Sequence, residues 1–314
     1  MRADVGGGWA SRKPVRLFAV CRVLFLSLGV CVCASLFGSS SGSWGSASAQ
    51  TQVPADSRLK SIIAKKVIRI AYRADARPFS FVNDAKEPLG YTIDLCKQAT
   101  KSIERQFGVP EIKIEWIPVT VETRFTAVAT GKADIECGSS TVTLGRMKEV
   151  DFSIFVFVES TGILVAGASN IHAFGEMAGK KIAVVSGTTN ERAVTEQVRL
   201  RGLNITLVAV KDRDEGVAAL EAGKVDGFAS DKLLLAGAQI KHPEAFVLLP
   251  DDLSIEQYAI VLPRGDWAFR LAINTGLAQI FRTGKTAEVF ERWFFGLQPG
   301  VLLSAVYALG RLSD

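Results

Sequence analysis

Strand-like and helix-like segments alternate along this chain, and this alternation restricts the folds open to it more than any other feature. Residues 67–72 alternate apolar and polar side chains, as a half-buried strand does. After them, the pattern predicts a helix at 93–107, a strand at 113–118, a helix at 123–130 and a strand at 133–136. Such a series predicts an α/β fold, in which ligands bind beyond the carboxyl ends of the strands.

The second half of the chain repeats this pattern between two extended segments. An unusually long apolar run covers 152–166, and another apolar strand is predicted at 257–263. Between them, strands and helices are predicted at 181–185, 191–201, 205–210, 215–221 and 225–229. Two extended crossings around an inserted unit favour two lobes joined by a hinge. One larger sheet is the alternative, because length alone does not decide between them.

We predict that lobe 1 is discontinuous and comprises residues 50–157 and 257–314, whereas lobe 2 comprises 158–256. Helical segments at 267–281 and 286–295 would return the chain to the first lobe. The apolar segment at 301–312 is expected to pack on the same lobe, although contact with a partner is the alternative.

The first 49 residues have the three parts of a secretory signal peptide. These parts are a basic start, an apolar run at 17–37 and the sequence Ala-Ser-Ala at 47–49. We expect cleavage after Ala49 and export to the periplasm. A membrane anchor is the alternative, but Arg22 interrupts the run, and the stretch after it is shorter than the about 20 residues of a spanning helix.

Most of the net charge of +5 comes from this same segment. Residues 50–314 contain 32 basic and 31 acidic residues, so the predicted mature chain has a net charge of +1. Nucleic acid and anionic membranes therefore lose their support as partners, because both require an excess of positive charge.

Two cysteines, Cys96 and Cys137, lie outside the signal segment. In an exported protein they suggest one disulfide, but two buried free thiols are the alternative, since the sequence gives no distance between them. The two histidines of the chain lie far apart and have no thiol cluster beside them, which gives no support to a zinc site. We expect neither a metal nor a cofactor.

Polar residues follow three of the predicted strands. Hydroxyl residues and an arginine occur at 139–146, hydroxyl residues occur again at 186–189, and Asp231 follows a third strand. Hydroxyls, backbone amides and a guanidinium can hold the carboxylate of a free amino acid, and a carboxylate can hold its ammonium group. The sequence therefore favours a free amino acid as the ligand.

Six short motifs occur in a fixed order: residues 73–81, 90–96, 136–141, 146 with 150–153, 186–189 and 231–237. This order resembles that of the periplasmic solute-binding proteins of ABC importers, in the family 3 branch that binds polar amino acids. The resemblance covers roughly residues 57–300 and is strongest to the glutamate/aspartate-binding proteins. It implies a type II periplasmic binding protein fold, with two α/β lobes joined by a two-strand hinge.

The resemblance also implies roles for residues that would hold the main-chain groups of the ligand. Arg146, Thr141 and Thr189 would bind the α-carboxylate, and Asp231 with Ser139 would bind the α-ammonium group. Charge-assisted bonds favour arginine for a planar carboxylate and an acid for a small cation. The alternatives are a surface salt bridge for Arg146 and a helix N-cap for Asp231.

The ligand's side chain would be recognised by arginines. Arg73 and Arg124 match positions that face the distal carboxylate in the acidic-amino-acid branch, although a solvated arginine is the alternative for each. Val121 stands where that branch usually has a serine, and Arg213 stands where it often has a histidine. Loss of the hydroxyl removes a hydrogen bond worth about 0.5–1.5 kcal/mol, whereas Arg213 keeps a cation at every pH.

The disulfide of better-known relatives is altered in this sequence. Cys137 matches one partner of that bond, but Ile260 stands where the other would lie. Cys96 would then have to serve as the partner.

The predicted function is capture of glutamate or aspartate by hinge closure and delivery to the membrane permease of an ABC importer. This function requires no enzyme activity, and a monomer is expected because the lobes must move freely. A periplasmic dehydratase on the same fold is one alternative, with Glu136 or Asp94 as its general acid, although Glu136 is expected to face solvent. A soluble subunit that reports ligand binding to a membrane receptor is the other.

Overall fold

The computed structural model describes residues 53–313 of the chain. The predicted signal peptide, residues 1–49, lies outside the described residues, so its cleavage stays a prediction. Across residues 53–313, none of the helices has the length and apolar character needed to cross a membrane.

Five strands form the first of two large sheets. Their spatial order is β5 (Lys113–Val119), β1 (Val67–Arg73), β6 (Ile135–Glu136), β13 (Glu256–Pro263) and β7 (Val150–Glu159). β1 runs parallel to β5 and β6, whereas β13 runs antiparallel to β6 and β7. The helices beside this sheet are α1 (Arg58–Lys65), α2 (Tyr91–Phe107), α3 (Arg124–Ala129), α7 (Trp267–Arg282), α8 (Lys285–Trp293) and α9 (Val301–Leu309).

Alternation along β13 shows why helices cover both faces of this sheet. Successive side chains of a strand point to opposite faces. Tyr258, Ile260 and Leu262 pack in the core that contains α2 and α7, whereas Ala259 and Val261 pack in a second core with α3. The apolar run predicted at 257–263 is therefore a strand that is buried on both sides.

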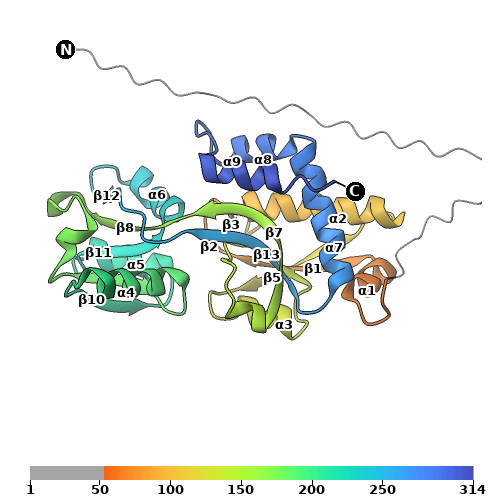
Figure 1. The fold of residues 1–314 in the computed structure, drawn as a ribbon, viewed down its shortest axis with the longest axis horizontal. Coiled ribbons are helices and arrows are strands. Elements are labelled where there is room, and N and C mark those ends of the chain that lie inside the picture. Colours follow the sequence, from red (N-terminus) through yellow and green to blue (C-terminus); the bar gives the residue numbers. More distant parts are fainter. Residues whose placement is uncertain (1–52, 314) are drawn as a thin grey trace, which may run out of the picture. The chain divides into compact units, whose positions relative to one another are not determined.

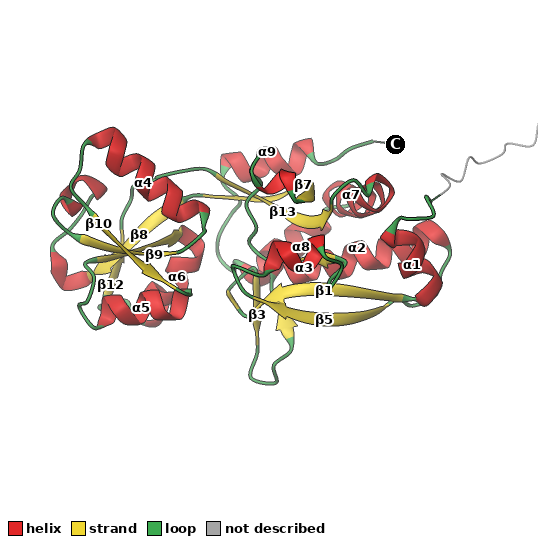
Figure 2. Cartoon of the chain, turned by 90° about the horizontal axis from the view of Figure 1, so that it is seen from below, coloured by secondary structure: helices red, strands yellow, loops and turns green. Residues whose placement is uncertain are grey.

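A second sheet of five strands forms the other half of the described chain. Its spatial order is β10 (Thr206–Val210), β9 (Lys181–Val185), β11 (Gly227–Asp231), β8 (Thr161–Ala166) and β12 (Phe246–Leu248). One face packs against α4 (Thr189–Arg201), and the other packs against α5 (Arg213–Glu221) and α6 (Lys232–Lys241). Figure 2 shows these helices on opposite sides of the strands.

Two neighbouring strands connect the sheets. β7 ends at Glu159 and the chain enters β8 at Thr161, while the return passes from β12 to β13. Figure 1 shows β7 and β13 running side by side toward the second sheet, and these strands pair antiparallel along their length. The fold is thus the two-lobed α/β type II architecture, and we call the halves with the first and second sheet the first and second lobe.

The predicted strands and helices are confirmed, with ends within two residues of those expected. The long apolar run is divided by Ser160 into β7 and β8. The prediction that the C-terminal segment packs on the first lobe is also confirmed, since Leu303 of α9 is buried in its core and Tyr307 bonds Tyr91. Smaller elements are β2 (Asp75–Ala76), β3 (Ser80–Val82), β4 (Pro88–Leu89), η1 (Arg146–Lys148), η2 (Gly167–Ser169) and η3 (Phe174–Met177).

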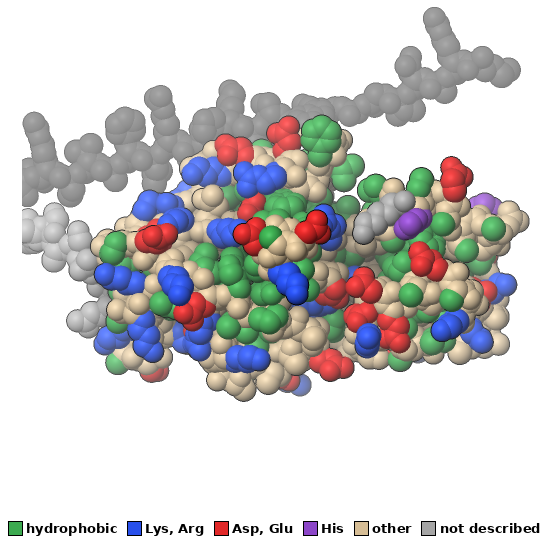
Figure 3. Space-filling view, turned by 180° about the vertical axis from the view of Figure 1, so that it is seen from behind, with side chains coloured by type: hydrophobic (Ala, Val, Ile, Leu, Met, Phe, Trp, Pro, Cys, Tyr) green, Lys and Arg blue, Asp and Glu red, His purple; other side chains and the backbone are tan. Residues whose placement is uncertain are grey.

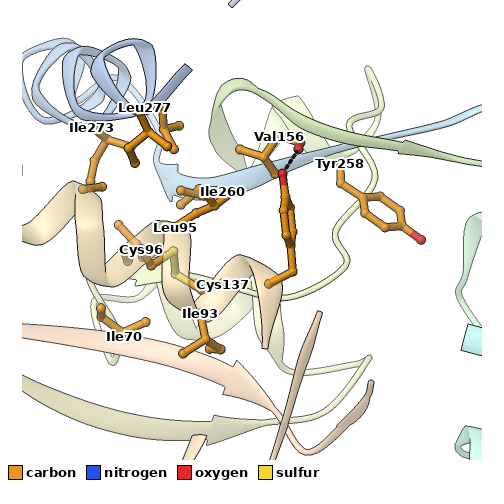
Figure 4. Packing of buried hydrophobic residues seen from close by; sticks show 14 of the residues in the cluster. Ile70, Ile93, Leu95, Cys96, Cys137, Val156, Tyr258, Ile260, Ile273 and Leu277 are labelled. Atoms are coloured by element: carbon orange, nitrogen blue, oxygen red, sulfur yellow. Dashed lines mark hydrogen bonds between the residues drawn. A yellow bond between two sulfur atoms is a disulfide. The ribbon is translucent and has the colours of Figure 1, made fainter. Parts of the chain in front are cut away.

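A disulfide joins Cys96 of α2 to Cys137, directly after β6. Both residues are fully buried among the apolar side chains drawn in Figure 4. In the same core, the Tyr91 hydroxyl donates to the Val156 carbonyl oxygen at 2.9 Å. The disulfide therefore anchors the start of the polar segment after β6 to the helix beside it.

Candidate ligand site

The predicted ligand residues come from strand ends and helix starts in both lobes. Arg73 ends β1 in the first lobe, and Asp231 ends β11 in the second. Thr189 begins α4 directly after the turn that follows β9. The hydroxyls of Thr141 and Thr189 lie 3.3 Å apart, so the two lobes meet at these residues.

Arg146 is held beside the polar segment of the first lobe. Its Nη1 donates to the carbonyl oxygen of Thr141 at 2.7 Å, and its guanidinium lies 4.8 Å from the ring centre of Phe125. Burial and the nearby charge of Arg192 lower the pKa of Arg146 to about 10, so the group stays charged at neutral pH. Among the described residues Arg146 forms no salt bridge, which contradicts the surface-pair alternative.

The turn before α4 provides a helix N-terminus at the same place. Thr188 is the N-cap residue, and its hydroxyl accepts a bond from the Glu191 amide at 3.2 Å. This cap leaves Thr189 in the first turn, where free amides and the positive end of the helix dipole favour an anion. The predicted role of Thr189 toward a carboxylate is compatible with this position.

Asp231 is 3% exposed and does not bond the helix that follows it. Its Oδ1 accepts from Asn190 at 3.1 Å, and its Oδ2 lies 3.7 Å from Arg213 Nη2. Burial raises the pKa of Asp231 above its ordinary value, an effect that Arg213 opposes. Asp231 therefore lies at the N-cap position of α6, as the alternative has it, but its buried side chain does not cap the helix.

Arg73 is almost fully buried, at 1% exposed. Its Nε and Nη2 donate to the two carboxylate oxygens of Asp75, at 2.8 and 2.6 Å. The remaining nitrogen, Nη1, is buried and has no hydrogen-bond partner among the described residues. Burial and the charge of Arg213 lower the pKa of Arg73.

Arg124 is 3% exposed at the start of α3, and its Nε is likewise buried without a partner in the described chain. Burial and the positive charges of Arg73 and Arg146 lower its pKa to about 9. The hydroxyl of Ser139 is also buried and unpaired within residues 53–313. Since buried polar groups are normally satisfied, these three residues mark where a polar ligand can bind. The solvated-arginine alternative is wrong for Arg73 and Arg124.

Arg213 begins α5 in the second lobe and crosses to the first. Its Nη1 donates to Asp75 Oδ2 at 3.2 Å, and its Nε donates to Ser230 at 3.2 Å. With Nη2 near Asp231, each of its three nitrogens faces a protein group. Asp75 therefore links the arginines of the two lobes, a contact that the sequence did not reveal.

Two cavities border these charges. One of about 380 Å³ is lined by residues that include Arg73, Asp75 and Val121, and another of about 370 Å³ includes Asp75 and Arg213. Val121, which stands where the acidic-amino-acid branch usually has a serine, packs in an apolar cluster with residues of the second lobe. This side chain therefore contributes to the contact between the lobes. A third, largely apolar cavity of about 740 Å³ lies between the lobe crossing and α9, and none of the predicted ligand residues lines it.

The expectation that Glu136 faces solvent is wrong, because this residue is completely buried. Ser140 donates to its Oε2 at 2.8 Å, and burial raises its pKa. β6 lies in the middle of the first sheet, and apolar cores with α2 and α7 on one face and α3 on the other exclude water from it. A side chain at Gly138 would collide with the Glu136 carboxylate, which explains the glycine within this motif.

Glu256 is a further buried carboxylate that sequence reasoning missed. Its oxygens accept bonds from Thr141 at 2.7 Å and from Ser254 at 2.6 Å. Because Thr141 belongs to the first lobe's polar segment and Thr161 of β8 also lies beside Glu256, this carboxylate connects the lobes at the hinge. The only signal was an acid at the start of an otherwise apolar strand. The described residues contain no group of His, Cys, Asp and Glu arranged to hold a metal ion.

A family model described as bacterial extracellular solute-binding proteins, family 3, matches residues 68–296. The chain belongs to this family. The match spans both lobes and every residue predicted to contact a ligand.

Two relatives and one solved structure agree with this assignment. The L-glutamate/L-aspartate-binding protein of Pseudomonas aeruginosa is 30% identical over 239 residues, covering 75% of this chain and 79% of that protein. The glutamate/aspartate import solute-binding protein of Escherichia coli K12 is 29% identical over 253 residues, covering 80% and 84%. A crystal structure of the ancestral amino acid-binding protein AncCDT-1, a precursor of cyclohexadienyl dehydratase, has a TM-score of 0.67 and 28% identity, covering 76% of this chain and all of that one. By their names, the two sequence relatives are binding proteins.

Proposed function

We propose that this protein is the substrate-binding protein of an ABC importer and that it captures an acidic amino acid, glutamate or aspartate. It would be secreted to the periplasm through cleavage of residues 1–49. The ligand would be enclosed by closure of the lobes about the β7–β8 and β12–β13 connections and then delivered to the membrane permease.

The observation that carries the proposal is a set of unpaired polar groups between charged residues. Arg73 Nη1 and Arg124 Nε are buried donors without partners in the described chain, and both belong to cations. A distal carboxylate would satisfy both, because charge-assisted bonds are stronger than neutral ones. The relatives from Pseudomonas aeruginosa and Escherichia coli, whose names specify glutamate and aspartate, support the same ligand class.

The main-chain groups of the ligand would lie on the other side of the same site. Arg146, Thr141 and the N-terminus of α4 would hold the α-carboxylate, and Asp231 with the unpaired Ser139 hydroxyl would hold the ammonium group. The groups that would hold the α-carboxylate come from both lobes. Ligand binding would therefore favour the conformation in which the lobes are in contact.

Isothermal titration of the purified protein, freed of carried-over ligand, tests the proposal. We expect L-glutamate or L-aspartate to bind, and L-lysine and glutarate to bind far more weakly, since each lacks one of the recognised groups. Arg146→Ala should weaken binding by about 30- to 4,000-fold, the equivalent of about 2–5 kcal/mol for a lost partner of a buried charge pair. Arg105→Ala, at an exposed position of α2, is the matched control and should bind normally. Stronger binding of glutarate or L-lysine would refute the assigned ligand class.

A further inference from the structure

Asp75 already accepts hydrogen bonds from arginines that were predicted to bind the ligand's side chain. Its carboxylate accepts two bonds from Arg73 and one from Arg213, within 3.2 Å in each case. The side chains of Arg73, Asp75 and Arg213 are 1%, 18% and 10% exposed. The cluster is therefore largely buried, and Asp231 adds a second carboxylate 3.7 Å from Arg213 Nη2.

The geometry decides which donors remain for a ligand. The bidentate pair with Asp75 engages the Nε and Nη2 edge of Arg73 and leaves only Nη1. Arg213 directs its three nitrogens at Asp75, Ser230 and Asp231. Arg124 keeps its unpaired Nε. Before any ligand binds, all three nitrogens of Arg213 thus face protein groups, and two of the three nitrogens of Arg73 donate to Asp75.

The charge of Asp75 acts against a ligand carboxylate at the same place. Burial alone would raise the pKa of Asp75, but Arg213 and Arg73 together hold it below its ordinary value, so the group is ionised at neutral pH. A ligand carboxylate on Arg73 Nη1 would share that guanidinium with a second anion. An amide oxygen can accept the same hydrogen bonds without this repulsion.

We propose that Asp75 is a specificity-determining residue, an internal carboxylate that lets the site accept the amides glutamine and asparagine beside the acidic amino acids. The inference rests on the proposed function, since it concerns the side-chain end of the same site. Asp75 does not need to touch the ligand; it determines how much positive charge Arg73 and Arg213 present to it.

A simpler role for Asp75 would be a structural tie between the lobes through Arg213. Such a tie would affect all ligands alike, because it acts on lobe closure and not on the side-chain end. The ratio of the glutamate and glutamine dissociation constants separates the two roles.

The experiment is titration of the full chain and its Asp75→Asn variant with L-glutamate and L-glutamine. We expect the wild type to bind the two ligands with dissociation constants within about tenfold, which is about 1.4 kcal/mol. Asp75→Asn should raise the preference for glutamate at least about tenfold, because Arg73 and Arg213 become available to the ligand carboxylate. Adding Arg213→Met to Asp75→Asn should remove part of that gain.

Asp214→Asn is the matched control, since Asp214 lines the same two cavities, is exposed and has no salt bridge within the described residues. It should leave the ratio unchanged. Thermal unfolding checks that Asp75→Asn is folded, and L-glutamate should raise its melting temperature more than L-glutamine does. Asp75→Ala provides the second test and should shift the preference in the same direction.

An unchanged ratio in both Asp75 variants, with glutamate still bound by the wild type, would overturn this inference and leave the proposed function intact. A parallel change for both ligands would likewise overturn it and indicate the structural tie. If the wild type binds none of these amino acids, the proposed function itself fails, and this inference fails with it.

Discussion

Removal of the Cys96–Cys137 disulfide tests how the polar segment is held in place. The bond closes a loop of 41 residues. If the bond acts by lowering the conformational entropy of the unfolded chain, a loop of this length raises the free energy of unfolding by about 4 kcal/mol at 25 °C. For a protein of this size, each 1 kcal/mol shifts the melting temperature by about 2–4 °C, so the bond should contribute about 8–16 °C.

The assay is urea unfolding of the oxidised protein, the protein reduced with dithiothreitol, and the Cys96→Ala/Cys137→Ala variant. The reduced wild type is the control for packing, because it keeps both sulfur atoms in the core. We expect the reduced protein to lose about 4 kcal/mol and the double variant to lose somewhat more, owing to the space left in a fully buried site. Equal stability of the oxidised and reduced proteins would refute the loop argument.

Two further changes probe buried acids. Burial raises the pKa of Glu159 to about 8 from its ordinary value of 4.5, so the folded protein keeps a proton that the unfolded chain releases. The free energy of unfolding should therefore fall between about pH 4.5 and pH 8, by up to about 1.4 kcal/mol per pH unit, and Glu159→Gln should remove this slope in urea unfolding; identical slopes would contradict it. Asp231→Asn should weaken glutamate binding about 30- to 4,000-fold in calorimetry, because the ammonium group loses its buried partner, and a change below about threefold would contradict that role.

Local patterns allowed most of the fold to be predicted. The apolar side chains of this chain recur at the helical period in its helices and at every second residue in its half-buried strands. Glycine or threonine often lies at the ends of the helices. The hinge was recognisable because β7 and β8 belong to one long, largely apolar run and are separated by a single residue, Ser160. The family motifs then gave the lobe arrangement, which periodicity alone left open.

The parts of the site that the sequence missed depend on contacts between distant residues. Asp75 meets Arg213 across 138 residues, and Glu256 meets Thr141 across 115. No local pattern distinguishes such acids from solvated ones. The pairing of Asp75 with Arg73 had one local signal, because residues two positions apart in an extended chain point to the same side.

The misjudgement of Glu136 has the same origin. The burial of this carboxylate follows from the central position of β6 and from the helices packed on both faces of the sheet, which the local sequence does not reveal. Figure 3 shows side chains of both signs of charge interspersed on the face it presents, as the near balance of acids and bases in residues 50–314 predicts.

A crystal structure of the protein with L-glutamate tests the central claim most directly. The account predicts the α-carboxylate on Arg146 and the N-terminus of α4, the ammonium group on Asp231, and the distal carboxylate on Arg73 Nη1 and Arg124. A ligand bound in the reverse orientation, or in the apolar cavity beside α9, would contradict the account.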